Sequence, residues 1–270
     1  MSTADLKPHR SLLSRFGDAF LGILAPPGVV VPDHLLSVRP DQHAYESLLS
    51  AIQRFRGSVY VADGAIPASE LDDQGRHFSI TDFRSWHVYL LDQQFSMAAC
   101  ARLRGYPETV GSHDLYLAHT LRRLPADQRS RYEAALQVHL DRLQHEGKRI
   151  AEVGGLAVDP QARGGTKTVI LIAACWALMR ALDSPYWGLS TTTLRYHANE
   201  LMRRFGAYPL EDNGVPLPPF FDSFHQCDLE LLVFDPSRPC TPAMEPTVAG
   251  MHRFLLSYFL MVPQEDKETA

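Results

Sequence analysis

The stretch EVGGLAVDPQARGGTKTVIL, residues 152–171, decides the fold. It begins in an apolar run, passes through a polar turn at 159–165, and enters a strongly apolar segment that continues to residue 182. A short apolar run bounded by turn residues is typical of a buried strand, whereas a longer one indicates a helix packed on a sheet. We therefore predict a strand over 150–158, a turn, and a buried helix over 166–182.

A second strand and helix follow directly. Residues 186–190 read as a short strand, and residues 196–205 as a helix closed by Gly206. This strand–helix–strand–helix order predicts two parallel strands joined by a crossover helix. The same signals predict the remaining elements: helices over 10–24, 42–56 and 126–146, a hairpin of 86–91 with 95–103, a late strand over 227–234, and a last helix over about 245–261.

The turn between the first strand and its helix has the composition of an anion site. Glycines let the backbone approach a ligand closely, and the free N–H groups at a helix start bind anions. Arg163 and Lys167 add positive charge. A P-loop is excluded because Thr166, and not a glycine, precedes Lys167. Two interpretations remain: a phosphate cradle, or a tight left-handed turn at Gly164–Gly165 that holds no ligand.

The run 152–171 resembles motif A of the GNAT superfamily of acyltransferases, and YHANELMRRFGAYPL, residues 196–210, resembles motif B. This resemblance implies a GNAT fold, a mixed α/β architecture with a central sheet flanked by helices. In such proteins a bulged strand exposes amides to the thioester, and the following loop holds the pyrophosphate of coenzyme A. Carried over, Leu156 and Val158 flank the bulge. The predicted phosphate arm consists of Arg163, Gly164, Gly165, Thr166, Lys167 and Thr168.

Glu152 is the predicted general base. An amine that attacks a thioester must lose a proton, and many GNAT enzymes place a glutamate five residues before the position of Ala157. The structural alternative is a strand-end carboxylate paired with Arg149 or Lys148. GNAT enzymes often protonate the leaving thiolate with a motif B tyrosine, but Met202 occupies that position here.

The N-terminal half resembles the acyl-homoserine-lactone synthases and the related N-acyl amino acid synthases. The matching runs are RFRGSVYVADGAI at 54–66 and ITDFRSWHVYLLDQQFSMAACARL at 80–103. Lactone synthases usually carry an arginine three residues after the glutamate, and Gly155 in that place weakens a lactone-synthase assignment. The chain length and the late segment CDLELLVFDPSRP, residues 227–239, are more similar to the N-acyl amino acid synthases. The residues at comparable positions, which the resemblance makes candidates for substrate binding, are Arg56, Asp82 and Arg102.

Two of these arginines have alternative interpretations. Arg102 suits bidentate binding of an acceptor carboxylate, but a surface ion pair fits it equally. Arg56 either contributes to substrate binding or ties the helix over 42–56 to Asp82 or Asp63.

Bulk composition excludes several classes of protein. The 270 residues carry a net charge of −5, which gives no general attraction to nucleic acid or an anionic membrane. No run approaches the roughly 20 apolar residues of a membrane span. The four cysteines are scattered without a C-x-x-C pair, so neither a metal site nor a disulfide framework is signalled. We expect a cytoplasmic protein without a signal peptide.

We predict three consecutive parts: an N-terminal helical extension (1–41), a GNAT acyltransferase domain (42–238) and a C-terminal extension with a helix (239–270). The predicted reaction moves a medium or long acyl chain from an acyl carrier protein or coenzyme A thioester to the amine of an amino acid or related metabolite. The acyl-CoA or acyl-phosphopantetheine thioester is a co-substrate, and no permanently bound cofactor is expected. The alternatives are a short-chain acetyl-CoA-dependent N-acetyltransferase and a non-catalytic domain that binds an acyl ligand.

Overall fold

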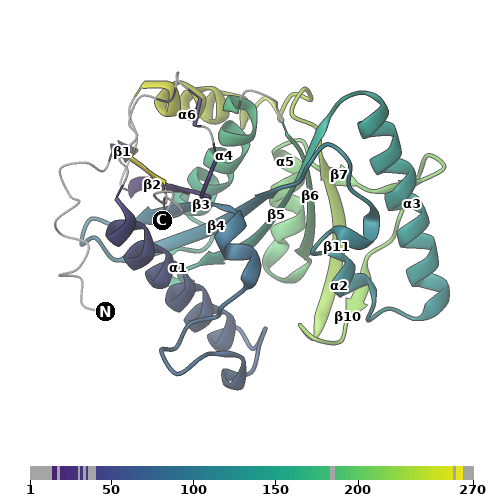
Figure 1. Cartoon of the computed structure of the whole chain (residues 1–270), viewed down its shortest axis with the longest axis horizontal. Helices are drawn as coiled ribbons and strands as arrows, with labels where there is room; N and C mark the ends of the chain where they lie inside the picture. The colour runs from purple at the N-terminus through teal and green to yellow at the C-terminus, as the bar shows by residue number, and fades with distance from the viewer. Residues whose placement is uncertain are drawn as a thin grey trace, which may run out of the picture. The chain divides into compact units, whose positions relative to one another are not determined.

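The computed structural model describes residues 14–16, 19–29, 31, 32, 35, 41–182, 186–257 and 260–263 (Figure 1). The chain divides into two compact units that are interleaved along the sequence. The first contains residues 1–104, 155–181 and 247–270, and the second contains 105–154 and 182–246. Strand β5 (Arg149–Val158) therefore passes from the second unit into the first after Gly154. The three consecutive parts predicted above are a different division, and they stay a prediction.

The sheet of the first unit is built around an antiparallel hairpin. Strands β3 (Trp86–Leu91) and β4 (Met97–Gly105) pair with each other, which confirms the predicted hairpin. Strand β2 (Ala19–Ala25) lies antiparallel on the other side of β3. The outer edge of β2 receives β1 (Ser14–Phe16), which is antiparallel, and β12 (Leu260–Pro263), which is parallel.

The predicted helix over 10–24 is wrong where the structure describes it, because these residues form β1 and β2. In the run AFLGILA of β2, six of the seven residues are buried, so the stretch has no polar face. Gly22 supplies a second reason for a strand. A Cβ on Gly22 would lie only 2.2 Å from the Tyr89 ring, so the glycine makes room for a tyrosine of the neighbouring strand. Residues 10–13, 17 and 18 lie outside the described residues.

Helices cover both faces of this sheet. Helix α1 (Gln42–Ala62) is capped by the Asp41 side chain and packs its apolar face into a core cluster with Tyr89 and Leu91. Helix α4 (Thr166–Ala181) packs on β3, all six residues of which are buried. Both helices confirm predictions. The predicted last helix is correct only in part, since α6 (Glu245–Ser257) ends early and β12 follows it.

The second unit contains the predicted parallel pair. Strand β6 (Tyr186–Thr193) pairs parallel with the first half of β5, and the chain between them includes α4. Strand β11 (Cys227–Phe234) follows antiparallel to β6 and carries β10 (Phe220–Asp222) and β7 (Tyr208–Pro209) on its far edge.

The helices of the second unit confirm the predictions at 126–146 and 196–205. They are α3 (Ala126–His145), which buries Leu136, Leu140 and Leu143, and α5 (Ala198–Arg204). The sequence did not reveal the short elements, which are α2 (Ala118–Leu121), β7, β10 and the hairpin of β8 (Glu211–Asp212) with β9 (Val215–Pro216).

Candidate active site

Strand β5 has an irregular backbone in its middle. Its register with β6 runs from Arg149–Tyr186 to Glu152–Leu189. Three residues later, Gly155 adopts a left-handed conformation with φ +61°. A left-handed residue interrupts the alternation of a strand and turns its amides out of the ladder. The irregularity thus lies at Gly155, one residue before the predicted bulge that Leu156 and Val158 flank.

Gly155 is also confined by its neighbours. A Cβ at this position would lie 3.2 Å from the Arg102 Cβ and 3.3 Å from Arg56 Nη1. The Gly155 carbonyl lies 3.8 Å from the Cys100 Sγ, which donates to it. The left-handed backbone therefore favours glycine, and the space around it is tight for any side chain.

We expect Gly155→Ala to destabilise the protein more than Gly164→Ala. Both residues are left-handed, so each change carries about 1–2 kcal/mol of backbone strain. A Cβ on Gly164 meets nothing within 4 Å, whereas one on Gly155 presses on both arginines. Urea unfolding of the two variants measures the difference. Equal losses would show that the arginines do not confine Gly155.

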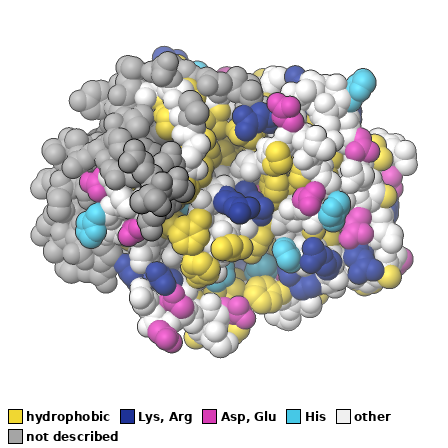
Figure 2. Space-filling model, viewed as in Figure 1, with side chains coloured by type: hydrophobic (Ala, Val, Ile, Leu, Met, Phe, Trp, Pro, Cys, Tyr) yellow, Lys and Arg dark blue, Asp and Glu magenta, His cyan; other side chains and the backbone are white. Residues whose placement is uncertain are grey.

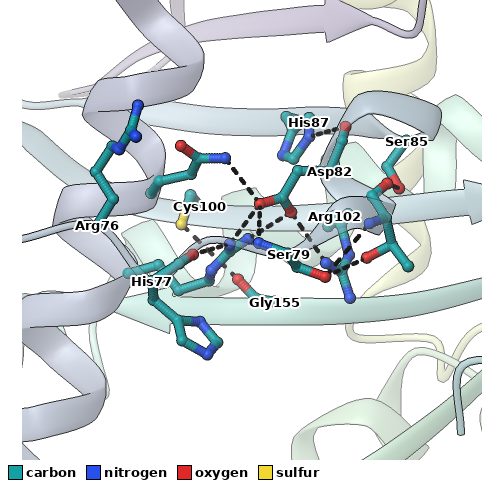
Figure 3. A network of polar contacts seen from close by, with 12 residues as sticks. Arg76, His77, Ser79, Asp82, Ser85, His87, Cys100, Arg102 and Gly155 are labelled. Atoms are coloured by element: carbon teal, nitrogen blue, oxygen red, sulfur yellow. Dashed lines mark hydrogen bonds and ion pairs between the residues drawn. The ribbon is translucent and has the colours of Figure 1, made fainter. Parts of the chain in front are cut away.

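The three predicted substrate-binding residues meet in one buried cluster, shown in Figure 3. Asp82, in the 3₁₀ helix Ile80–Arg84, is fully buried. Arg56 from α1 donates to both carboxylate oxygens of Asp82, from Nη1 to Oδ1 at 3.0 Å and from Nη2 to Oδ2 at 2.7 Å. Arg102 from β4 donates to Asp82 Oδ1 at 2.9 Å and is itself buried. The interpretation of Arg56 as a tie to Asp82 is confirmed, and the interpretation of Arg102 as a surface ion pair is wrong.

Further donors complete the shell around Asp82. The Gln53 side chain and the Ser79 amide donate to its Oδ2 at 3.0 and 3.2 Å. Burial alone would raise the pKa of this carboxyl, but the charge and hydrogen bonds of Arg56 outweigh burial and hold the pKa well below its usual range. Asp82 is therefore an anion that pins α1 and β4 beside the irregular strand. Its oxygens are occupied by protein donors.

His87 borders the same cluster as a neutral ring. Its Nε2 lies 2.9 Å from the Asp82 carbonyl oxygen, an acceptor, so Nε2 carries the proton. Burial lowers the pKa of His87 to about 4, although Asp82 acts in the opposite direction. The ring is thus uncharged at neutral pH and adds no third positive charge beside the two arginines.

The predicted base, Glu152, is held by donors of the second unit. It is 8% exposed. Its Oε2 accepts from the Tyr106 hydroxyl and, at 2.8 Å, from the Tyr116 amide, while its Oε1 accepts from the Leu117 amide at 2.6 Å. A carboxylate has about four acceptor positions, so one remains on Oε1. The predicted alternative partners, Arg149 and Lys148, are not among these donors.

The predicted phosphate arm adopts a defined turn. Asp159 accepts from the Gln161 amide, Gly164 is left-handed with φ +70°, and α4 begins at Thr166. The amides of Thr166, Lys167 and Thr168 therefore lie in the first helical turn, where N–H groups have no partner within the helix. The Thr168 hydroxyl oxygen is buried and lacks a hydrogen-bond partner among the described residues.

Arg163 is engaged by the protein itself. Its guanidinium makes a two-pronged ion pair with Asp63 at 2.8 and 2.7 Å, and its Nε donates to the Val158 carbonyl. The pair joins the end of α1 to the turn before α4. The predicted role of Arg163 at a phosphate stays a prediction, and Asp63, one of the two partners considered for Arg56, pairs with Arg163.

Other chemistry-bearing residues are located as follows. Met202, at the position of the motif B tyrosine, is buried, whereas Tyr196 is exposed and left-handed. All four cysteines are free thiols. In the described part of the chain, no three His, Cys, Asp or Glu side chains gather to hold a metal. No helix among the described residues is long and apolar enough to cross a bilayer.

No family model and no curated protein matches the sequence. Solved structures do match. A CoA-dependent acyl-homoserine lactone synthase, BjaI, in complexes with SAM and isopentyl-CoA or with MTA, is 15% identical at a TM-score of 0.52, covering 91% of this chain and 94% of that one. TofI, in a ternary complex with an inhibitor and MTA, is 14% identical at a TM-score of 0.49, covering 86% and 99%. The similarity to BjaI confirms the predicted fold class over nearly the whole chain.

Proposed function

We propose that this protein is an N-acyltransferase that moves an acyl group from a coenzyme A or acyl carrier protein thioester to the amine of an amino acid or related metabolite. The observation that carries the proposal is strand β5. It bears a buried carboxylate at Glu152, a left-handed glycine three residues later, and a glycine-containing turn that leads into helix α4. The fold shared with a CoA-dependent acyl-homoserine lactone synthase supports it.

In the proposed reaction, backbone amides stabilise the oxyanion and bind the phosphates of the donor. Amides turned out of the strand beside Gly155 stabilise the oxyanion that forms when the amine attacks the thioester carbonyl. The first-turn amides of α4, with Lys167 and Thr168, bind the phosphates of the donor. Arg163 contributes by fixing this turn through Asp63.

Glu152 is the proposed general base, and it accepts one proton in the reaction. Three donors fix its orientation, and the remaining acceptor position on Oε1 takes a single proton, directly or through water. The same bonds anchor the segment around residues 116–117, so the residue also supports structure. We therefore propose a proton-accepting role and an anchoring role together.

We propose that the cluster of Arg56, Asp82 and Arg102 positions the strand instead of clamping the acceptor directly. Asp82 has protein donors on both oxygens, and both arginines bind Asp82. The arginines confine Gly155, so they set the backbone on which the oxyanion depends.

Gly155 argues against a lactone product, because it occupies the position of an arginine that lactone synthases usually carry. An arginine side chain there would start from a left-handed backbone, with its Cβ in tight contact with Arg102 and Arg56. The structure thus gives a steric reason why this chain does without the arginine typical of lactone synthases.

Thiol release tests the proposal. Purified protein is mixed with acetyl-CoA, a long-chain acyl-CoA or a long-chain acyl carrier protein, each with a pool of amino acids. We expect acceptor-dependent thiol release with a long-chain donor. Release with acetyl-CoA alone would instead support a short-chain acetyltransferase. No release with any donor would overturn the proposal and favour a domain that only binds acyl ligands.

A further inference from the structure

An ion pair lies at the turn that leads into helix α4. Asp63, the residue that ends α1, accepts two hydrogen bonds from the Arg163 guanidinium, from Nη1 at 2.8 Å and from Nη2 at 2.7 Å. The Asp63 side chain is 19% exposed and that of Arg163 is 24% exposed, so solvent screens the pair only in part. Both residues belong to the first compact unit, as do Gly155 and α4. The pair therefore places a carboxylate at the predicted phosphate arm.

The pair is also close to the amides of α4. Arg163 precedes Thr166, the first residue of α4, by three positions, so their Cα atoms are at most about 11 Å apart. The Arg163 Nε donates to the Val158 carbonyl at 3.2 Å, which holds the guanidinium at the end of β5. A charge here acts on an anion bound at α4, because the Debye length is about 8 Å at physiological ionic strength and about 30 Å at 0.01 M.

Asp63 has an unfavourable position for its own helix. The C-terminal end of a helix is the negative end of its dipole, so cations stabilise that end and carboxylates do not. The last turn of α1 has no basic residue, and only the Asp63 amide continues the helix, donating to the Val59 carbonyl at 3.0 Å. The Asp63 side chain instead binds Arg163. The carboxylate is therefore suited to the turn before α4 more than to α1.

The side-chain charges at the predicted phosphate arm cancel. Residues 159–168 contain one acidic and two basic side chains, Asp159, Arg163 and Lys167, which leave one excess positive charge. Asp63 supplies the negative charge that balances it. Figure 2 shows a similar balance on one face of the molecule, where Lys and Arg side chains are interspersed with Asp and Glu side chains. The positive potential that remains at the arm comes from the first N–H groups of α4.

This potential suits a ligand with a single negative charge. The N-terminus of a helix is equivalent to about half a positive elementary charge and binds anions through its N–H groups. Phosphopantetheine on a carrier protein brings one phosphodiester with one negative charge. Coenzyme A brings a diphosphate with two, and a further phosphate on its ribose. To use Arg163, a diphosphate would have to displace Asp63 and leave a partly buried carboxylate beside its own charges, which weakens binding.

We propose that Asp63 determines the choice of acyl donor: by neutralising Arg163, it favours phosphopantetheine on a carrier protein and disfavours coenzyme A. This rests on the proposed function and names the donor of that reaction. Arg163 keeps its role of fixing the turn, while the first-turn amides of α4, with Lys167 and Thr168, bind the phosphodiester. Asp63 does not touch the donor, so its effect depends on the charge of the donor and on the salt concentration.

Asp63→Asn tests the inference, because it removes the negative charge and keeps an oxygen that accepts from Arg163. The dissociation constant of coenzyme A, measured by calorimetry at low salt, should fall about 5-fold. This gain should disappear at about 0.5 M salt. With a long-chain acyl carrier protein, kcat/KM should change less than about 2-fold, because its phosphodiester carries less charge. The wild type should have a higher kcat/KM with the acyl carrier protein than with the corresponding acyl-CoA.

Two control variants separate the charge of Asp63 from other effects. Asp63→Glu keeps the negative charge and should bind coenzyme A as the wild type does. Asp72→Asn removes the charge of another aspartate of the first unit, one that pairs with Arg76, and should leave the reaction with both donors unchanged.

The outcomes separate this inference from the proposed function. An unchanged dissociation constant for coenzyme A in Asp63→Asn, or a wild type that prefers acyl-CoA, would overturn the inference, although acyl transfer would stand. Equal losses with both donors, in Asp63→Asn and Asp63→Glu alike, would show that the pair is only a structural tie. A wild type that releases no thiol from any donor would overturn the proposed function itself.

Discussion

Asp82→Ala is expected to be the most destabilising single change in the first unit, costing about 3–5 kcal/mol of unfolding free energy. Removing this carboxylate leaves two buried arginines without the anion they share. Urea unfolding followed by circular dichroism measures the loss. The control is Asp72→Ala, which removes a partly exposed pair with Arg76 together with two amide hydrogen bonds from Gln74 and Arg76, and should cost clearly less. A loss of similar size in both variants would contradict the role given to the buried cluster.

Because the pKa of Asp82 is depressed, we also expect the free energy of unfolding to depend on pH. A carboxyl whose folded pKa lies below its unfolded value of about 3.9 contributes stability that is complete above that pH and is lost as the pH falls through the folded value. Wild-type stability should therefore decline below about pH 4. Asp82→Asn should show a smaller decline over the same range, because its side chain no longer titrates.

Glu152→Gln is expected to lower kcat by about 10²–10⁴-fold, since it removes the proposed proton acceptor. Glutamine also presents an N–H group where three donors converge, so one of them loses its acceptor. This structural effect should cost about 1–3 kcal/mol and must be separated from catalysis. Tyr106→Phe does so, because it deletes one donor and leaves the carboxylate in place.

The comparison of the two variants decides between the roles of Glu152. A base requires Glu152→Gln to lose far more activity than Tyr106→Phe at equal folded fraction. If Glu152 only anchors the segment near residue 117, the two variants should lose activity in proportion to their loss of stability. Activity measured at several temperatures below unfolding, together with thermal melts, provides both quantities.

The middle of the chain was predictable because each element carries its own signal. The apolar run of α4 and the flanking strands differ in length and turn chemistry, and the structure has them within a few residues of the predicted positions. The stretch 19–25 carries no such signal, because a short apolar run with a central glycine fits a helix or a strand equally. Its strand state depends on pairing with β3 and β12, which are distant in sequence.

The sequence allowed individual residues of the candidate site to be predicted, but not the partners with which they make contact. Glu152 was found from its motif, whereas two of its three donors are backbone amides about 35 residues away, which leave no trace in a sequence. Arg163 gives a second example. Its predicted role at a phosphate stays a prediction, and its ion pair with Asp63, 100 residues earlier, had no signal in the sequence.

The most direct test of the central claim is to measure the amide product and the free thiol in the same reaction. Wild-type protein with a long-chain acyl thioester and the pooled amino acids should form one N-acyl amino acid, identified by mass spectrometry, for every thiol released. Omitting the acceptor should abolish both signals. Thiol release without an amide, at a rate unaffected by the acceptor, would show a thioester hydrolase and contradict the account.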